Sequence, residues 1–307
     1  MLVVAALGGN ALLRRGEPLE AEVARRNAKV AADALAAVAR EHRLVVTHGN
    51  GPQIGLLALQ SEAYRDVRSY PLDVLGAESE GMIGYLLEQE LGNALPDRQV
   101  ASLLTQTVVD ASDPAFGRPT KPIGPLYDAE IAQQLAAQRG WAIAPEGAET
   151  SERSWRRVVA SPAPRSIVEL PTIKLLLGHE VLVICAGGGG IPVVVDAFGA
   201  HRGVEAVVDK DSATALLAQE LGADLLVLLT DVPAVELDWG TPHARALRTT
   251  TVSELGEHRF AAGSMAPKVA AAMSFVSNTG RPAAIGALAN AAAVVNGTAG
   301  TLVRREP

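Results

Sequence analysis

Three lysines in glycine- or proline-rich segments are the residues of this sequence best suited to chemistry. Lys210 stands between Asp209 and Asp211, Lys268 follows a Gly-Ser-Met-Ala-Pro run, and Lys121 has a proline on either side of its segment. Only five of the 27 basic residues are lysine, so these positions favour a compact ammonium over a planar guanidinium. Such a cation, held by a carboxylate, can neutralise a phosphoryl group. The alternatives are a solvated turn for Lys210 and an exposed loop lysine for Lys121.

Glycine loops follow three apolar runs of the chain. They are Gly8-Gly9-Asn10, Gly49-Asn50-Gly51 and Gly187-Gly188-Gly189-Gly190. Glycine has no Cβ, so its N–H group can approach a ligand closely, and amides at a strand end are a recurrent anion site. Taken alone, the first loop favours the alternative of an ordinary tight turn. Four consecutive glycines lose much conformational entropy on folding, so the third loop is hard to explain as a simple connection between two elements.

Together the loops and lysines predict a phosphoryl-transfer site, in which cations and amides stabilise charge spread over three equatorial oxygens. Other chemistries lack their motifs. The chain has no Walker A sequence, no G-x-S-x-G, and one residue too many in residues 49–55 for a dinucleotide G-x-G-x-x-G. The six histidines have no metal-ligand spacing, and Cys185 is the single cysteine. The sequence therefore predicts no metal held by protein side chains.

The elements that must position these residues alternate between strands and helices. Strands are expected at residues 2–7, 44–47, 100–109, 180–186, 204–208, 224–229, 283–288 and 300–303. Helices are expected at residues 20–41, from about 52, around 81–91, and at 166–178, 212–221, 250–259 and 268–279. This alternation predicts an α/β fold with a mainly parallel sheet covered by helices on both faces. Ligands of such folds bind at the carboxyl ends of the strands.

Residues 112–164 interrupt this rhythm. Prolines punctuate the segment and its apolar periodicity weakens, so we expect a small lid subdomain inserted into a single domain that spans residues 1–307. A static dimerisation arm is the alternative for this segment.

Composition excludes several classes of protein. The 307 residues carry a net charge of -7, which disfavours a nucleic-acid binder because such proteins usually present a basic surface. No apolar run approaches the length of a membrane span and no signal peptide is evident. Together with the lone cysteine, this predicts a cytoplasmic protein with no membrane or nucleic-acid partner.

Six motifs, in order along the chain, resemble the carbamate kinase family. They are Ala6-Leu7-Gly8-Gly9-Asn10-Ala11, Thr47-His48-Gly49-Asn50-Gly51-Pro52-Gln53, Pro119-Thr120-Lys121-Pro122-Ile123-Gly124-Pro125, residues 187–194, Val207-Val208-Asp209-Lys210-Asp211 and Gly263-Ser264-Met265-Ala266-Pro267-Lys268. The resemblance implies the amino-acid kinase fold, a three-layer α/β/α sandwich, and a homodimer. It also implies reversible phosphoryl transfer between ATP and carbamate with Mg²⁺, giving ADP and carbamoyl phosphate, in the cell toward ATP synthesis and within arginine metabolism.

The resemblance also implies roles for individual residues. Lys121, Lys210, Asp211 and Lys268 would be catalytic, with Lys121 on the lid and Asp211 orienting the lysines. The residues that would bind phosphate and substrate are Gly8, Gly9, Asn10, Gly49, Asn50, Gly51, Gly188 and Gly189. The residues that would bind the nucleotide are Lys210, Thr230, Asp231, Met265 and Lys268, while Mg²⁺ would be held mainly by phosphates and water.

Two other functions stay open. A sister kinase of the same fold would phosphorylate an amino-acid carboxylate or a nucleoside monophosphate. A metabolite sensor on the same scaffold would bind without catalysis, although the three retained loop lysines argue against it. A nicotinamide-dependent oxidoreductase is disfavoured by the broken glycine spacing.

Overall fold

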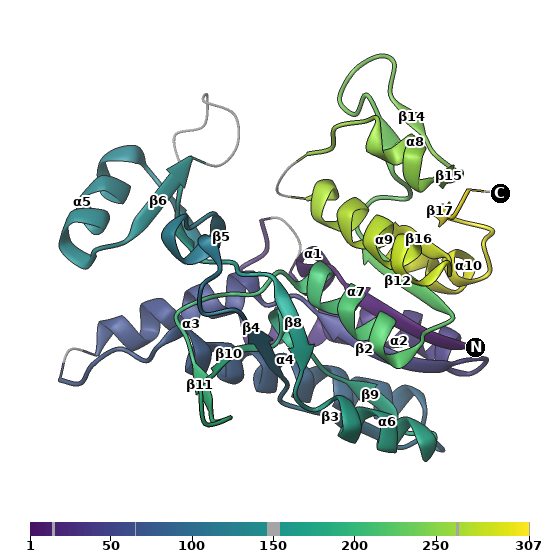
Figure 1. Cartoon of the computed structure of the whole chain (residues 1–307), viewed down its shortest axis with the longest axis horizontal. Helices are drawn as coiled ribbons and strands as arrows, with labels where there is room; N and C mark the ends of the chain where they lie inside the picture. The colour runs from purple at the N-terminus through teal and green to yellow at the C-terminus, as the bar shows by residue number, and fades with distance from the viewer. Residues whose placement is uncertain (14–15, 65, 146–153, 262–263, 307) are drawn as a thin grey trace.

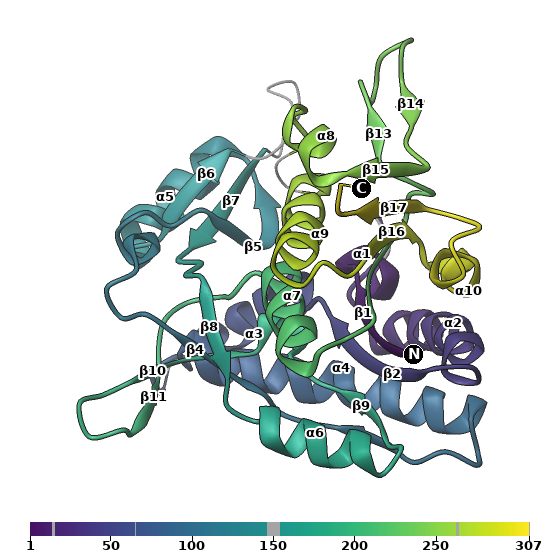
Figure 2. The same cartoon turned by 45° about the vertical axis from the view of Figure 1, so that its right-hand side comes forward.

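The computed structural model describes residues 1–13, 16–64, 66–145, 154–261 and 264–306. Its centre is an eight-stranded sheet in the order β15-β17-β16-β12-β1-β2-β9-β3 (Figures 1 and 2). Its strands are β1 (Leu2–Leu7), β2 (Arg43–His48), β3 (Val100–Ser102), β9 (Leu182–Ile184), β12 (Leu225–Thr230), β15 (Thr249–Thr251), β16 (Ala283–Ala287) and β17 (Thr301–Arg304). All neighbours are parallel except β16 and β17, which confirms the expected mainly parallel sheet.

Helices cover both faces of this sheet because alternate side chains of its strands point to opposite sides. Val3, Ala5 and Leu7 of β1 join one core cluster and Leu2, Val4 and Ala6 join the other. The first cluster lies under α2 (Ala21–Ala39), α4 (Leu72–Ala94) and α10 (Ala291–Val295). The second lies under α6 (Leu170–Gly178), α7 (Lys210–Leu221), α8 (Val252–Gly256) and α9 (Met265–Thr279). The structure is therefore a three-layer sandwich.

Two of the three smaller sheets in the described residues extend from the sandwich. A four-stranded sheet has the order β11 (His201–Gly203), β10 (Ile191–Val195), β4 (Gln106–Val109) and β8 (Pro164–Ile167). A three-stranded sheet has the order β5 (Lys121–Tyr127), β7 (Trp155–Val159) and β6 (Ala142–Pro145), and α5 (Ala129–Arg139) lies against it. Figure 1 shows this small sheet standing apart from the main sheet, above α3 (Gly51–Ala63). The remaining elements of the described residues are α1 (Gly9–Leu12), a two-stranded sheet of β13 (Glu236–Leu237) and β14 (Arg245–Ala246), and three short 3-10 turns (Pro114–Gly117, Gly187–Gly189 and Leu288–Asn290).

Several expected elements differ from the structure. The strand expected at residues 100–109 is two strands in two sheets, because the chain turns away at Thr105, whose N–H donates to the buried Glu80. The helix expected at 166–178 begins only at Leu170, since Ile167 pairs with Thr107 in a strand. Residues 204–208 form no strand, and α8 covers only part of 250–259, after β15. Helix α9 begins three residues before Lys268.

The small sheet is fixed to the main body by a close backbone contact. A Cβ placed on Gly55 of α3 would lie 2.1 Å from Cα of Gly124 in β5, so only a glycine fits between the two elements.

Replacing Gly55 by Ala should therefore push β5 away from α3 and destabilise the protein by about 1–3 kcal/mol, the usual cost of overpacking. Thermal unfolding and limited proteolysis of residues 112–164 would measure this. The matched control is Gly92→Ala, also inside a helix but with open space at its Cβ. Equal effects of the two substitutions would contradict the role given to the contact.

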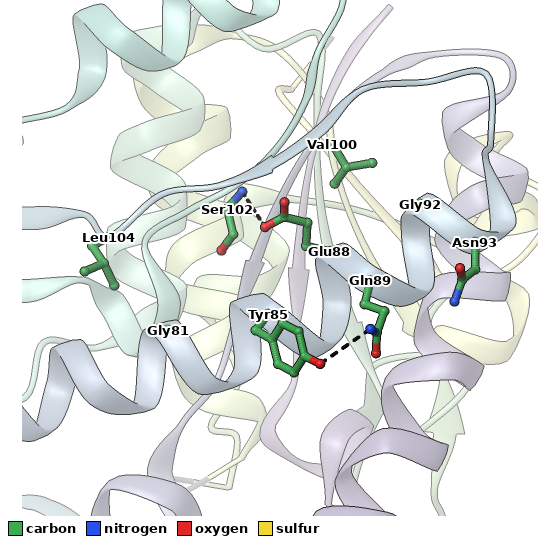
Figure 3. A pocket seen from close by; sticks show the side chains of 9 residues that line it. All are labelled: Gly81, Tyr85, Glu88, Gln89, Gly92, Asn93, Val100, Ser102 and Leu104. Atoms are coloured by element: carbon green, nitrogen blue, oxygen red, sulfur yellow. Dashed lines mark hydrogen bonds between the residues drawn. The ribbon is translucent and has the colours of Figure 1, made fainter.

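A shallow groove of about 630 Å³ runs along α4 beside the edge strand β3. Figure 3 shows Glu88 in this groove, where its Oε2 accepts the N–H of Ser102 at 3.2 Å. No segment that carries a predicted site residue lines the groove, so it lies apart from the site described next.

Candidate active site

The predicted site lies where the central strands end together. Leu7 is paired with both His48 and Leu229 in the sheet register, so β1, β2 and β12 end in one row. The carbonyl of Leu7 accepts the N–H of Gly49 at 3.1 Å and Nζ of Lys210 at 3.0 Å. The N–H of Gly8 donates to the carbonyl of Leu229 at 2.9 Å. Two glycine loops and one lysine therefore meet at the carboxyl end of β1.

The three lysines converge on the two carboxylates that flank Lys210, Asp209 and Asp211. Asp209 caps α7 by accepting the N–H of Ser212 through Oδ1 at 3.0 Å, and its Oδ2 accepts Nζ of Lys121 at 2.6 Å. Asp211, in the first turn of α7, lies 3.0 Å from Nζ of Lys210 and 3.3 Å from Nζ of Lys268. Helices α7 and α9 lie side by side (Figure 1), which brings their first turns together.

Burial makes this cluster electrostatically strong. Lys210 is 8% exposed and Asp211 4%, which excludes the solvated turn considered for Lys210. Burial opposes ionisation of Asp211, but Lys210 and Lys268 outweigh it and hold its pKa below the usual value. Burial also opposes ionisation of Asp209, but Lys121 outweighs this effect, so the pKa of Asp209 is lowered as well. Burial lowers the pKa of Lys210, an effect that Asp211 opposes. Three ammonium groups facing two carboxylates leave an excess of positive charge suited to an anion.

The loops after β2 and β9 touch each other. Asn50 is buried, and a Cβ on Gly188 would lie 2.1 Å from its Nδ2. A Cβ on Gly189 would lie 2.6 Å from the carbonyl of Val208, next to Asp209. Gly51 begins α3. Of the predicted substrate residues, Gly49, Gly188 and Gly189 are therefore packed without room for a side chain, and Gly188 lies directly against the buried side chain of Asn50.

Replacing Gly188 by Ala should lower kcat/KM for the phosphoryl acceptor by at least tenfold, because the new methyl must displace Asn50. Gly188 also has a positive φ of 66°, so part of any stability loss is backbone strain. Gly222→Ala isolates that strain, since Gly222 has a φ of 63° and open space at its Cβ. Steady-state kinetics on both variants would check the prediction, and equal loss of activity in both would contradict it.

Of the residues predicted to bind the nucleotide, Thr230, Asp231 and Met265 are not part of the lysine cluster. Thr230 ends β12 beside Gly8, and its hydroxyl donates to Asp231 at 3.1 Å on an exposed surface. Met265 begins α9 and packs partly on the core. Gly9 lies in α1, where a Cβ on Gly49 would approach its N–H at 3.1 Å. The side chain of Asn10, and Gly263 of the last motif, lie outside the described residues.

Sequence reasoning missed several residues that shape the site. Asp209 was seen only as a neighbour of Lys210, yet it binds Lys121. Ser79 and Glu80 of α4 are almost fully buried and hold the loops that follow β2 and β9. Glu80 lies three and seven residues before the buried Ile83 and Leu87, a helical spacing that would have placed it on the buried face.

His48 and Glu80 flank the glycine loop after β9. A Cβ on Gly187 would lie 2.4 Å from the imidazole of His48 and 2.9 Å from Cγ of Glu80. Burial lowers the pKa of His48 to about 4, so its ring is neutral near pH 7. Burial raises the pKa of Glu80 to about 8, although the N–H groups of Thr105 and Gly187 oppose this.

The family model of the amino acid kinase family matches residues 1–287. With the mainly parallel sheet and the strand-end site, this match places the chain in the amino acid kinase family.

Whole-chain relatives narrow the assignment. A carbamate kinase of Rhizobium meliloti (strain 1021) is 57% identical over 99% of this chain and 93% of its own length. A carbamate kinase of Haemophilus influenzae is 51% identical over 100% of this chain and 97% of its own. The structure of a carbamate kinase from Giardia lamblia bound to AMP-PNP has a TM-score of 0.89 at 40% identity, covering 99% of this chain and 98% of that one. Within the family, the chain groups with the carbamate kinases.

Helices long and apolar enough to cross a membrane are absent from the part of the chain that the structure describes.

Proposed function

We propose that this chain transfers a phosphoryl group reversibly between ATP and carbamate, giving ADP and carbamoyl phosphate. The observation that carries the proposal is the convergence of Lys210 and Lys268 on Asp211 at the end of β1, in a chain that groups with the carbamate kinases. In the forward step an oxygen of carbamate attacks the γ-phosphorus of ATP, and the bond from that phosphorus to the bridging oxygen of ADP breaks. In the reverse step a terminal oxygen of ADP attacks the phosphorus of carbamoyl phosphate and releases carbamate.

The lysines of the cluster stabilise this transfer electrostatically. The transition state spreads negative charge over the equatorial oxygens, so fixed cations and amides lower its energy without a covalent intermediate. Lys210 and Lys268 are held by Asp211 before substrate arrives, so little reorganisation is needed during reaction. The first turns of α7 and α9 add the positive ends of their helix dipoles. The N–H group of Gly9, at the start of α1, would add a further donor, whereas that of Gly8 already donates to the carbonyl of Leu229.

Magnesium would enter with the nucleotide. Among the described residues there is no group of three His, Cys, Asp or Glu side chains that could hold a metal ion, and Asp209 and Asp211 are engaged by lysines. This donor set fits a metal bound mainly by the phosphates and water. When bound, the ion would neutralise charge on the nucleotide phosphates.

Lys121 is the cluster lysine that belongs to the small sheet, and we propose that this sheet acts as a lid. The ion pair of Lys121 with Asp209 joins the sheet to α7, and the contact of Gly55 with Gly124 joins it to α3. Closing over bound substrates would place Lys121 beside the transferred group.

We further expect a cytoplasmic homodimer that works toward ATP synthesis in arginine metabolism, and light scattering in solution would test the dimer.

The deciding assay mixes the protein with ADP, Mg²⁺ and carbamoyl phosphate and measures ATP. ATP formation is expected, and it should stop when Mg²⁺ is removed by chelation. Parallel reactions with ATP and an amino-acid carboxylate or a nucleoside monophosphate test the sister kinases. Phosphorylation of either acceptor without use of carbamoyl phosphate would overturn the proposal, and tight binding without any turnover would indicate a sensor.

A further inference from the structure

Two consecutive residues of α4, Ser79 and Glu80, face the interior directly behind the loops that follow β2 and β9. They are 0% and 1% exposed. A fully buried glutamate is rare because its carboxyl group must find partners inside the protein. Neither residue touches the lysine cluster, and the phosphoryl transfer described above does not use them.

Ser79 holds the loop that follows β2. Its Oγ accepts Nδ2 of Asn50 at 2.8 Å and donates to the carbonyl of Gly76 at 2.8 Å. With the hydroxyl proton committed to Gly76, the oxygen is free to accept, which fixes the direction of the Asn50 amide. The oxygen of that amide is left for other partners.

Glu80 holds the loop that follows β9. Its Oε1 accepts the N–H of Gly187 at 2.8 Å and its Oε2 accepts the N–H of Thr105 at 3.1 Å. Oγ1 of Thr105 in turn accepts the N–H of Ala186 at 2.9 Å. Ala186 has a φ of 49°, a left-handed conformation that is unfavourable for alanine and persists only where the surroundings enforce it. Glu80 and Thr105 supply that enforcement.

The two loops so held are the ones that meet where Gly188 packs on Asn50. Adjacent residues on one rigid helix therefore set the distance between the loops. We propose that Ser79 and Glu80 are positioning residues. By fixing the distance between the two loops, they set the width of the subsite that binds carbamate or carbamoyl phosphate, and so restrict it to a small planar acyl phosphate. This inference rests on the proposed function for the identity of the acceptor.

The test compares Ser79→Ala and Glu80→Gln with the unaltered protein. Ser79→Ala leaves Nδ2 of Asn50 without its acceptor. In Glu80→Gln the side-chain amide group faces the N–H of either Gly187 or Thr105, so one of these two hydrogen bonds is lost. For each we expect KM for carbamoyl phosphate to rise about tenfold, the loss of one buried hydrogen bond, while KM for ADP stays within about twofold. Discrimination against propionyl phosphate, which has a bulkier acyl group, should fall about tenfold as the subsite loosens.

The matched control is Glu88→Gln, two turns further along α4. Glu88 also accepts a backbone N–H, that of Ser102 at 3.2 Å (Figure 3), but β3 carries none of the site loops. It should change neither KM nor discrimination. Ser79→Ala should fold, because alanine favours helix. The inference is overturned if this variant leaves KM for carbamoyl phosphate and discrimination unchanged. It is also overturned if KM for ADP rises as much as KM for carbamoyl phosphate, as in a general loss of structure. If the unaltered protein makes no ATP from carbamoyl phosphate, the proposed function has failed, and the same variants are then compared on the acceptor that is used.

Discussion

Replacing Lys210 by Ala should lower kcat for ATP formation about a thousandfold while the protein stays folded. Removing a single preorganised donor from a transition-state charge costs about 10²–10³ in kcat, and Lys210 is a full cation that is 8% exposed. Its ammonium bridges the carbonyl of Leu7 and Asp211 at 3.0 Å each, so no other lysine can take its place. Initial rates with ADP and carbamoyl phosphate would measure the effect, and circular dichroism would verify the fold.

The control for this variant is Lys29→Ala. Lys29 pairs with Asp33 on the outside of α2 with 62% of its side chain exposed, so its loss should leave kcat unchanged. Lys210→Met adds a second comparison, because methionine keeps the volume of the side chain but not its charge. A Met variant as active as the unaltered protein would show that Lys210 acts through packing and would refute its catalytic role.

Replacing Asp211 by Asn should have the largest effect on stability. Asp211 is the shared carboxylate between Lys210 and Lys268, and removing one partner of a buried ion pair costs about 3–5 kcal/mol because it leaves a charge uncompensated. Two ammonium groups would then repel each other at the end of β1. The melting temperature should fall by roughly 5–10 °C, and kcat should fall as well because the lysines lose their orientation.

The sign of the pH dependence follows from the lowered pKa of Asp211. A carboxyl group with a lowered pKa stabilises the fold above its unfolded pKa and loses that contribution as the pH falls through the folded value. The difference in stability between the two proteins should therefore persist from about pH 5 to pH 8. Added ATP should restore part of the lost stability, since its phosphates replace the missing negative charge. Asp33→Asn, at the exposed pair with Lys29, is the control, and an Asp211→Asn protein as stable as this control would contradict the argument.

The cluster explains why the site carries both signs of charge. Lysines brought together without carboxylates would destabilise the folded protein before substrate binds. Asp209 and Asp211 offset this repulsion through separate lysines, Lys121 for the first and Lys210 with Lys268 for the second. The lysines come from three different elements, β5, α7 and α9. The site is therefore assembled from the whole chain rather than from one loop.

Much of this protein was determined by local features of its sequence. The apolar run before Gly8 must be a buried strand, and the glycines after it must form a loop at its carboxyl end. The same reasoning placed Gly49 and Gly187 at strand ends, and six motifs in order indicated the family that the comparisons show. It was wrong for Lys210, which was expected after a strand at residues 204–208 but follows an irregular segment and begins α7. Local patterns failed where packing overrode them, as at residues 100–109, where the anchoring of Thr105 by Glu80 splits one expected strand between two sheets.

The partners of the site residues were decided only by the tertiary structure. Lys121 and Asp209 are 88 positions apart, and Glu80 and Gly187 are 107 apart. Which distant groups meet depends on the order of strands in the sheet and on the packing of helices against it, neither of which is encoded in a short stretch of residues. The sequence by itself determined that cations and glycine amides would gather at the strand ends. The fold decided which carboxylate holds each lysine and which helix holds each loop, because a buried charge or amide must be paired with whatever group the packing brings to it.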